Sequence, residues 1–581
     1  MTKNTIAAVV LSVAFLILWN RFYRPAVVTT PHANNNSVAD SNSQCSSNAK
    51  EPKSSGDLLT TKKSAAHAPE LKEKTFVIES ENARITFTSS GGAIKKYELK
   101  NASPKTANQV PSGQKEGQKE YFNLIPSDDG EGIFATRQIN GAELSEARIF
   151  VKPANNPDVV ISEQTSLSSN SGNNGKYIVR KIYRLAAHTT GKESGATSYL
   201  EGLDIEVISI DKKSTSGTIK NPAILNMILS KGLAENSFSS ANNEKENISL
   251  NSVKYLPPVG KKVYRLKSGE ISLISEQDNT SARWVASDNR YYISAMIPLE
   301  DGGKSFLAGD KLEVKRLSKN SYPLAQISLA ITPDSVTRRF KIYIGGKSFQ
   351  TLKQTAPYLE KTIDFGLMGG LGKFFLESLI FIKKFTNNYG WAIVILSLAI
   401  QIITLPLSLK SLKATADMKR LQPLMREIQT KYKDDPRRMN VEMMNLYKTH
   451  KVNPLSGCLP MLLQMPIFWA LFTTLRNAYE LKNAGWILWI KDLSAHDPFY
   501  VLPILMGLGM FGQQFMSGAT QDPQNKMMGY IFPAVFTFMF LKFPSGVVLY
   551  WLINSILTIS IQFFFLEKET IKEHRQITTA G

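Results

Sequence analysis

Cysteine and histidine are scarce in this chain. Its 581 residues include two cysteines, Cys45 and Cys458, and six histidines. The cysteines lie far apart in unlike contexts, and neither a CxxC nor an HExxH spacing occurs, so a disulfide framework and the common zinc sites are disfavoured. We therefore expect no metal and no other cofactor.

A complete phosphate-binding loop is also missing. Two GGKS stretches, at 302–305 and 345–348, match the final Gly-Lys-Ser of such a loop. The loop needs a further glycine five residues before its second glycine, where this chain has Pro298 and Lys341. We exclude nucleotide binding at both stretches.

The net charge of +20 raises the question of nucleic acid. A nucleic-acid binder is expected to carry a compact basic motif with interleaved aromatic residues, and the chain has none. We expect no direct nucleic-acid binding, because the basic residues are better explained by membrane topology.

Apolar residues are concentrated at the N-terminus and after about residue 365, which predicts a multi-domain membrane protein. We expect an anchor helix at 1–25. The run that begins at Ile6 could also be a cleaved signal peptide, but Arg21 and aromatic residues follow it instead of a small-residue cleavage site. Residues 26–74 are polar and of low complexity, typical of a flexible linker.

Residues 75–345 alternate apolar and polar side chains over many short segments, such as KYIVRKIYRL and QISLAITP. This pattern predicts a large all-β domain, a β-sandwich. Residues 346–388 form a connector with an amphipathic helix, which would either lie in the membrane interface or pack on the sandwich. An all-α five-helix core at 389–566 and a tail at 567–581 complete the predicted architecture.

Five segments of the core are about long enough to cross roughly 30 Å of hydrocarbon: 389–409, 458–475, 499–515, 527–543 and 547–566. With the anchor they make six spans, so both termini share one side of the membrane. Residues 410–451 hold eleven Lys or Arg against five Asp or Glu, which places this stretch in the cytoplasm. The termini are then cytoplasmic and the β domain is extracytoplasmic.

The stretch 410–451 is predicted to form a helical hairpin that breaks at DDP, 434–436, with Pro423 as a cost to its first helix. It would be either a solvated positive loop or a mobile element that captures incoming chains. Its candidate capture residues are Lys419, Arg420, Met425, Tyr432 and Met443.

Neutral polar residues recur at helical spacing inside the spans. Ser397, Gln401 and Thr404 share one face of the first core span, Tyr550 and Asn554 share a face of the last, and Gln464 lies in the second. They would either bond helix to helix, at about 0.6 kcal/mol each, or line a wet cavity. The spacing leaves both open.

Four stretches then carry a specific resemblance: NPLSGCLPMLLQMPIFWALF at 453–472, FPSGVVLYW at 543–551, LQPLMREIQTKYKDD at 421–435 and WILWIKDLSAHDPFYVLPILMG at 486–507. They resemble the YidC/Oxa/Alb family of membrane protein insertases over roughly residues 350–566. The layout of anchor, β domain and five-helix core is similar to that of the Gram-negative members.

The resemblance implies a non-enzymatic insertase of the bacterial inner membrane, with a periplasmic β domain. It would help nascent membrane proteins enter the bilayer, alone or with the Sec translocon. The implied partners are those substrates, the translocon, ribosomes or targeting factors, and membrane lipids. The resemblance also implies that this chain does not hydrolyse nucleotides.

The resemblance also implies site residues. A hydrophilic groove, open to cytoplasm and lipid, would contain Ser397, Gln401, Thr404, Gln464, Tyr550, Trp551 and Asn554. Substrates would slide past Met461, Met465 and Phe468. Gln401 stands where bacterial members usually carry the groove arginine, so an electrostatic pull on acidic substrates is in doubt here.

Two other function classes are alternatives to an insertase. A transporter or channel would be expected to show internal repeats, broken helices or a buried ionisable pair, and none is recognisable in the sequence. A sugar-acting enzyme could reside in the β domain, because such sandwiches resemble sugar-binding folds. No paired-carboxylate site can be identified from spacing alone.

Overall fold

The computed structural model describes most of the chain after residue 72. The described residues are 73–79, 83–100, 121–125, 132–152, 159–166, 176–185, 200–210, 223–233, 251–257, 259–267, 269–273, 282–299, 310–315, 322–331, 337–450, 452, 459–517 and 526–580. The predicted anchor and nearly all of the predicted linker lie outside them.

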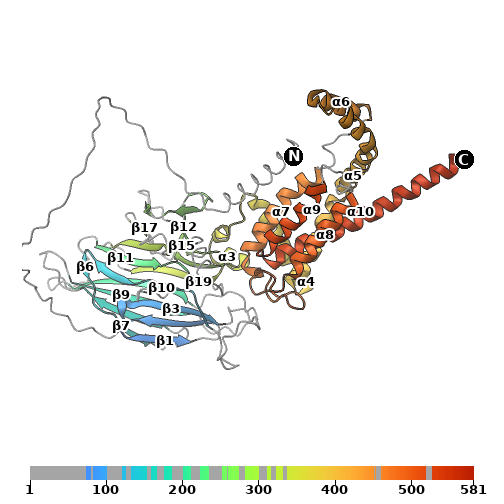
Figure 1. The fold of residues 1–581 in the computed structure, drawn as a ribbon. Helices are drawn as coiled ribbons and strands as arrows, with labels where there is room; N and C mark the ends of the chain where they lie inside the picture. Colours follow the sequence, from blue (N-terminus) through green and yellow to red (C-terminus); the bar gives the residue numbers. More distant parts are fainter. Residues whose placement is uncertain are drawn as a thin grey trace, which may run out of the picture. The chain divides into compact units, whose positions relative to one another are not determined.

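The β domain contains three sheets whose strands all pair antiparallel (Figure 1). The four-stranded sheet has the order β1-β2-β3-β4: Thr75–Glu79, Ala83–Thr88, Ala93–Lys100 and Tyr121–Asn123. The six-stranded sheet has the order β14-β17-β18-β11-β5-β6: Ile271–Leu273, Lys311–Lys315, Leu324–Ile331, Ala223–Ser230, Thr136–Ile139 and Ala142–Glu143.

The nine-stranded sheet has the order β13-β12-β15-β16-β19-β10-β9-β8-β7. Its strands are Tyr264–Leu266, Ser252–Leu256, Trp284–Asp288, Tyr292–Pro298, Thr337–Gly346, Leu200–Ile210, Lys176–Leu185, Val159–Thr165 and Arg148–Lys152.

The alternation read from the sequence places side chains as expected. Along β8 and β18, buried residues alternate with half-buried ones, because successive side chains of a strand point to opposite faces. One apolar cluster draws residues from all three sheets, among them Phe87, Tyr183 and Leu225. The predicted fold class, an all-β domain joined to a helical core, is confirmed.

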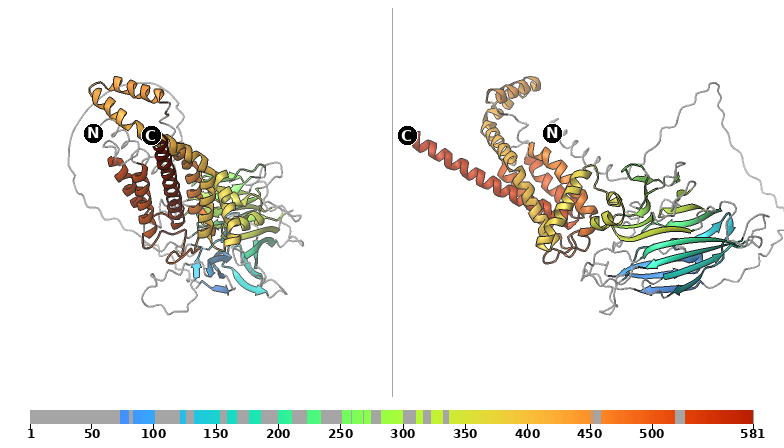
Figure 2. Two further views of the ribbon diagram at one scale, coloured as in Figure 1. Left: turned by 90° about the vertical axis from the view of Figure 1, so that its right-hand side faces the viewer. Right: turned by 180° about the vertical axis from the view of Figure 1, so that it is seen from behind.

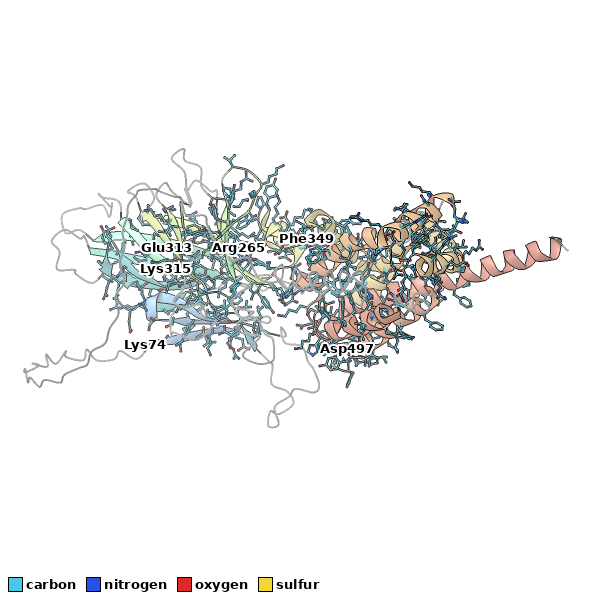
Figure 3. The ribbon with its side chains drawn as sticks, turned by 45° about the horizontal axis from the view of Figure 1, so that its top comes forward. Lys74, Arg265, Glu313, Lys315, Phe349 and Asp497 are labelled. Carbon is cyan, nitrogen blue, oxygen red and sulfur yellow. The ribbon has the colours of Figure 1, made fainter. Side chains whose placement is uncertain are left out.

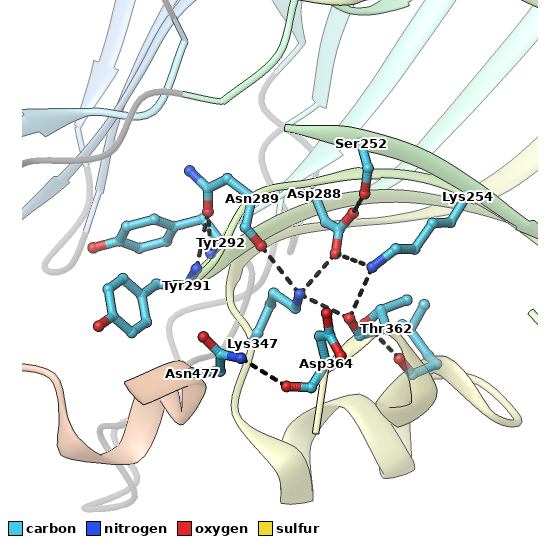
Figure 4. Close-up of polar contacts among 11 residues, drawn as sticks. Ser252, Lys254, Asp288, Asn289, Tyr291, Tyr292, Lys347, Thr362, Asp364 and Asn477 are labelled. Atoms are coloured by element: carbon cyan, nitrogen blue, oxygen red, sulfur yellow. Dashed lines mark hydrogen bonds and ion pairs between the residues drawn. The ribbon is translucent and has the colours of Figure 1, made fainter. Parts of the chain in front are cut away.

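A buried charge cluster fastens the connector to the nine-stranded sheet (Figure 4). The Asp288 carboxylate accepts from Lys347 Nζ at 2.7 Å and from Lys254 Nζ at 2.8 Å, and both ammonium groups also donate to the Thr362 carbonyl oxygen. Burial alone would raise the pKa of Asp288, but the two ammonium groups hold it below its usual value. Burial lowers the pKa of Lys347 to about 8 despite Asp288.

The connector contains α3 (Phe349–Thr355), the short helix η2 (Leu359–Thr362) and α4 (Gly369–Thr386). Helix α4 buries Phe375, Leu376 and Leu379 and exposes Phe374 and Phe381. One face thus packs on protein, and an exposed aromatic face remains, as an interfacial helix requires.

The core helices pack into a bundle, drawn in yellow to red in Figure 2. They are α5 (Tyr389–Lys431), α7 (Leu459–Asn477), α8 (Val501–Ser517), α9 (Lys526–Phe540) and α10 (Ser545–Ala580). The hairpin helix α6 spans Pro436–Thr449, and a short helix η4, Tyr479–Leu481, follows α7.

Two helices are longer than the predicted spans. α5 continues without interruption through the predicted span and the first half of the hairpin, with Pro406 and Pro423 inside it. α10 continues 14 residues past the predicted boundary at 566, through the predicted tail. Among the described residues, Tyr389–Met418 and Ser545–Phe565 are long and apolar enough to cross a membrane, and Val501–Met516 and Tyr530–Phe540 are shorter apolar helices.

Candidate functional site

The hydroxyl groups on the polar face of α5 are satisfied by their own helix. Ser397 Oγ donates to the Ile393 carbonyl oxygen at 2.7 Å, and Thr404 Oγ1 donates to that of Ile400 at 3.0 Å. Both are bonds to the residue four positions earlier, a common pattern for hydroxyls inside helices. These two side chains therefore do not tie α5 to another helix.

The amides of the site are different. Gln401 is 7% exposed and Asn554, on α10, is half-buried, yet neither side-chain amide makes a hydrogen bond with any residue that the structure describes. Each amide offers two donors and one acceptor, so both side chains are suited to bind water.

One side-chain bond does join two core helices. Gln464 Nε2 on α7 donates to the Tyr550 hydroxyl on α10 at 2.5 Å. The structure thus brings together two predicted groove residues from spans 86 residues apart in sequence. Helix-to-helix bonding accounts for this pair but leaves Gln401 and Asn554 unexplained.

Next to this pair lies an aromatic cluster that joins α7, α9 and α10. The rings of Phe468 and Trp551 meet edge to face with centroids 4.9 Å apart, and Phe540 lies 5.4 Å from Trp551. Phe468 is only 6% exposed, because these rings cover it. Met465 is half-buried, and of Met461 only the backbone, in α7, is described.

Sequence reasoning gave Phe536 and Phe540 no role, although both rings contact Trp551. A signal was available. Phe532, Phe536 and Phe540 recur every fourth residue, which aligns them on one face of α9.

The hairpin residues lie at the junction of α5 and α6. Met425 Sδ accepts from the Tyr447 hydroxyl at 3.9 Å, and the Arg438 guanidinium lies 5.3 Å from the centre of the Tyr432 ring. Asp435 caps α6 by accepting from the Arg438 backbone N–H. Met443 is half-buried, Arg420 is exposed, and the side chain of Lys419 lies outside the described part.

The conspicuous stretch 486–507 is organised by one buried carboxylate. Asp497, labelled in Figure 3, accepts from the backbone N–H groups of Phe499 and Leu502 and from Trp489 Nε1, at 3.0, 2.7 and 2.9 Å. These bonds satisfy donors at the entry to α8. Asp497 lies within the motif at 486–507, but the sequence alone predicts no role for it.

Two family models match the chain. The 60Kd inner membrane protein model matches residues 381–573, which include α5 to α9 and most of α10, and the YidC periplasmic domain model matches residues 232–382. The Membrane protein insertase YidC of Geotalea daltonii is 31% identical over 569 residues, covering 97% of this chain and 99% of the relative.

The chain belongs to the YidC family of membrane protein insertases. The YidC protein of Endomicrobium trichonymphae is 48% identical over 339 residues, which cover 56% of this chain and 63% of that relative. YidC membership confirms the predicted family and function: an inner-membrane insertase with a periplasmic domain, and not an enzyme.

Among solved structures, an active YidC insertase covers 84% of this chain and is itself covered to 92%, at 18% identity and a TM-score of 0.38. A galactose mutarotase related enzyme from Lactobacillus acidophilus covers 47% of the chain at 7% identity and a TM-score of 0.26. Both scores are too low to support a structural argument, so YidC membership rests on sequence.

Proposed function

We propose that this YidC-family chain inserts nascent hydrophobic segments through a wet groove where α5, α7 and α10 meet. The observation that carries the proposal is the pair of amides, Gln401 and Asn554, that lack protein hydrogen-bond partners among the described residues. Water is the partner that satisfies them, and water needs a path from the cytoplasm. Ser397 and Thr404 lie on α5 about one turn before and one turn after Gln401, and the Gln464–Tyr550 bond joins α7 to α10.

The groove acts by shortening the distance that a polar segment of the substrate must cross through hydrocarbon. Moving a charged residue through hydrocarbon costs about 2.5–3.5 kcal/mol on insertion scales. A polar stretch of substrate that rests beside the Gln401 amide keeps part of its hydration while the following apolar segment reaches lipid. No fuel is consumed, because the final state with the apolar segment in the bilayer is the more stable one.

Gln401 also means that the proposed groove has no positive charge at this position. A neutral amide cannot attract an acidic substrate tail as the arginine of other family members could. Hydration, and not electrostatic pull, is therefore the proposed contribution of this position.

The lipid-facing exit runs along α7 and α9, the third and fifth of the six predicted spans. Met465 is accessible there, and Met461 lies one turn earlier on the same helix. Phe468 is covered by Trp551, so a passing segment contacts Phe468 only once the Trp551 ring has moved. Flexible methionine and large rings suit apolar partners of varied shape.

The topology in this proposal has both termini in the cytoplasm and the β domain in the periplasm. The α5–α6 hairpin then faces the cytoplasm, where Arg420, Met425, Tyr432 and Met443, with Lys419, meet incoming chains, ribosomes or targeting factors. The Sec translocon is a further proposed partner, reached through the membrane.

Reconstitution tests this function directly. Purified full-length chain in liposomes should protect a short two-span substrate from added protease, and empty liposomes should not. Equal protection in both would refute insertion by this chain alone.

A further inference from the structure

The segment after α7 carries a lysine into a cage of aromatic rings from the β domain. Lys482 Nζ lies 4.4 Å from the ring centre of Tyr292, 4.9 Å from that of Tyr291 and 5.7 Å from that of Phe122. The ammonium nitrogen is buried. Aromatic faces attract cations, by about 2 kcal/mol or more when the pair is desolvated.

The cage is rigid and comes from two different sheets. Phe122 belongs to β4, whereas Tyr292 is the first residue of β16 and Tyr291 directly precedes it. The Asn289 side-chain oxygen accepts from the backbone N–H groups of Tyr291 and Tyr292, at 3.0 and 2.7 Å (Figure 4). Phe122 packs against Tyr292 with centroids 5.4 Å apart. The rings are therefore held in place independently of Lys482.

Further contacts reach the same end of α7. The Tyr291 hydroxyl donates to the Arg476 carbonyl oxygen at 3.0 Å, in the last turn of the helix. Asn477 Nδ2 donates to the Asp364 carbonyl oxygen at 2.8 Å (Figure 4). The Tyr479 ring lies so close to Gly346 that a Cβ there would come within 2.1 Å of it. The carboxyl end of α7 is thus fixed to the β domain and the connector.

This fixed end bears on the proposed site because of where Pro466 lies. A proline inside a helix removes one backbone hydrogen bond, so it separates α7 into two parts that can bend relative to each other. The part after Pro466 contains Phe468 and ends at Asn477, whose side chain is bonded to the connector. Holding Asn477 therefore holds Phe468 against Trp551.

We infer that Lys482 is a positioning residue for insertion: its aromatic cage in the β domain holds the outer part of α7, and with it the Phe468–Trp551 contact, in place. This inference rests on the proposed function of the α7 face. It assigns the β domain a part in insertion, as a clamp on α7.

The test compares full-length variants reconstituted in liposomes with the two-span substrate. K482M keeps the length of the side chain and removes its charge, and we expect a roughly tenfold slower insertion. K482R keeps a cation that can stack on aromatic rings, so it should retain most activity. K491M alters an exposed lysine of the same inter-helix segment and should behave as wild type.

A second readout separates positioning from general damage. A photocrosslinker at position 465 should capture less substrate in K482M, whereas one at position 443, in the hairpin, should capture as much as before. Y291F, which loses only the hydroxyl donor to Arg476, should change both readouts in the same direction but less. It provides the test if K482M does not fold.

Wild-type insertion speed in both K482M and Y291F would overturn the inference. So would equal losses in K482R and K482M, because the cation would then be irrelevant. Failure of the wild-type chain to insert would instead refute the proposed function, so the two failures are distinguishable.

Discussion

At the scale of single residues, the polar groups of α5 divide into two kinds. The hydroxyls of Ser397 and Thr404 are bonded to their own helix, whereas the side-chain amide of Gln401, a residue only 7% exposed, makes no hydrogen bond with any described residue. The face that looked uniform in the sequence therefore has one position whose polar group is not satisfied by the helix itself. That position is the natural target for mutation.

Replacing Gln401 separates hydration from charge. Q401L should lower insertion of the two-span substrate several-fold, because the groove loses its central donor and acceptor. Q401R should insert at least as well as wild type, since a guanidinium also binds water. Protease protection measures both, and the opposite ranking would contradict the hydration account.

Asp288 offers a test of stability. D288N leaves Lys254 and Lys347 buried without their counter-charge, and removal of one member of a buried ion pair typically costs about 3–5 kcal/mol. We expect a clearly lower melting temperature of the full-length protein in detergent. K315M breaks the more exposed Lys315–Glu313 pair on β17, labelled in Figure 3, and should cost less than about 1 kcal/mol. Equal melting of D288N and wild type would refute the role of the cluster.

At the scale of elements, α5 continues without interruption into the first half of the hairpin, so one helix joins the wall of the proposed groove to the proposed capture element. Deleting 421–446 and joining the ends with a short Gly/Ser linker should abolish insertion while the core still folds. Near-normal activity of this variant would contradict the capture role and favour the alternative, a solvated and positively charged loop. Insertion and thermal melting are measured on the same preparation.

Helix η4 should respond to pH through Glu480. Burial raises the pKa of its carboxyl group, whose Oε1 accepts from the Phe349 N–H at 2.7 Å. A raised folded-state pKa means that the contribution to stability is complete below the ordinary value of 4.5 and is lost as pH rises through the folded-state value.

E480Q is neutral at every pH and lacks this dependence. The melting temperature of E480Q relative to wild type should therefore rise as pH increases from the ordinary value of 4.5 through the raised folded-state value. A difference that stays constant over this range would show that Glu480 does not titrate as the structure implies.

The helices and strands also show which structural features could be predicted from the sequence. Period-two alternation and long apolar runs are local, so the strands and the positions of the core helices were predictable. The uninterrupted course of α5 was not, because Pro406 and basic residues are poor markers of helix continuity once tertiary packing supports the helix. The covering of Phe468 by Trp551 and the cage around Lys482 join residues distant in sequence, which no local pattern encodes.

At the scale of the whole molecule, a membrane core and a β domain are joined by buried charge and aromatic contacts around Asp288 and Lys482. The core supplies the proposed path for substrates, and the β domain is inferred to hold one wall of it. The proposed path depends on water reaching the region between α5 and α10 from the cytoplasm.

Thiol labelling in inverted membrane vesicles tests that claim most directly. In a chain with Cys45 and Cys458 replaced by serine, single cysteines at 401 and 554 should react with a membrane-impermeant maleimide, and one at 397, a turn nearer the periplasm, should react more slowly. A cysteine at 403, where Ile403 is 76% exposed on the outside of the bundle, should stay unlabelled in lipid. If positions 401 and 554 are as unreactive as 403, the groove is dry and the account is wrong.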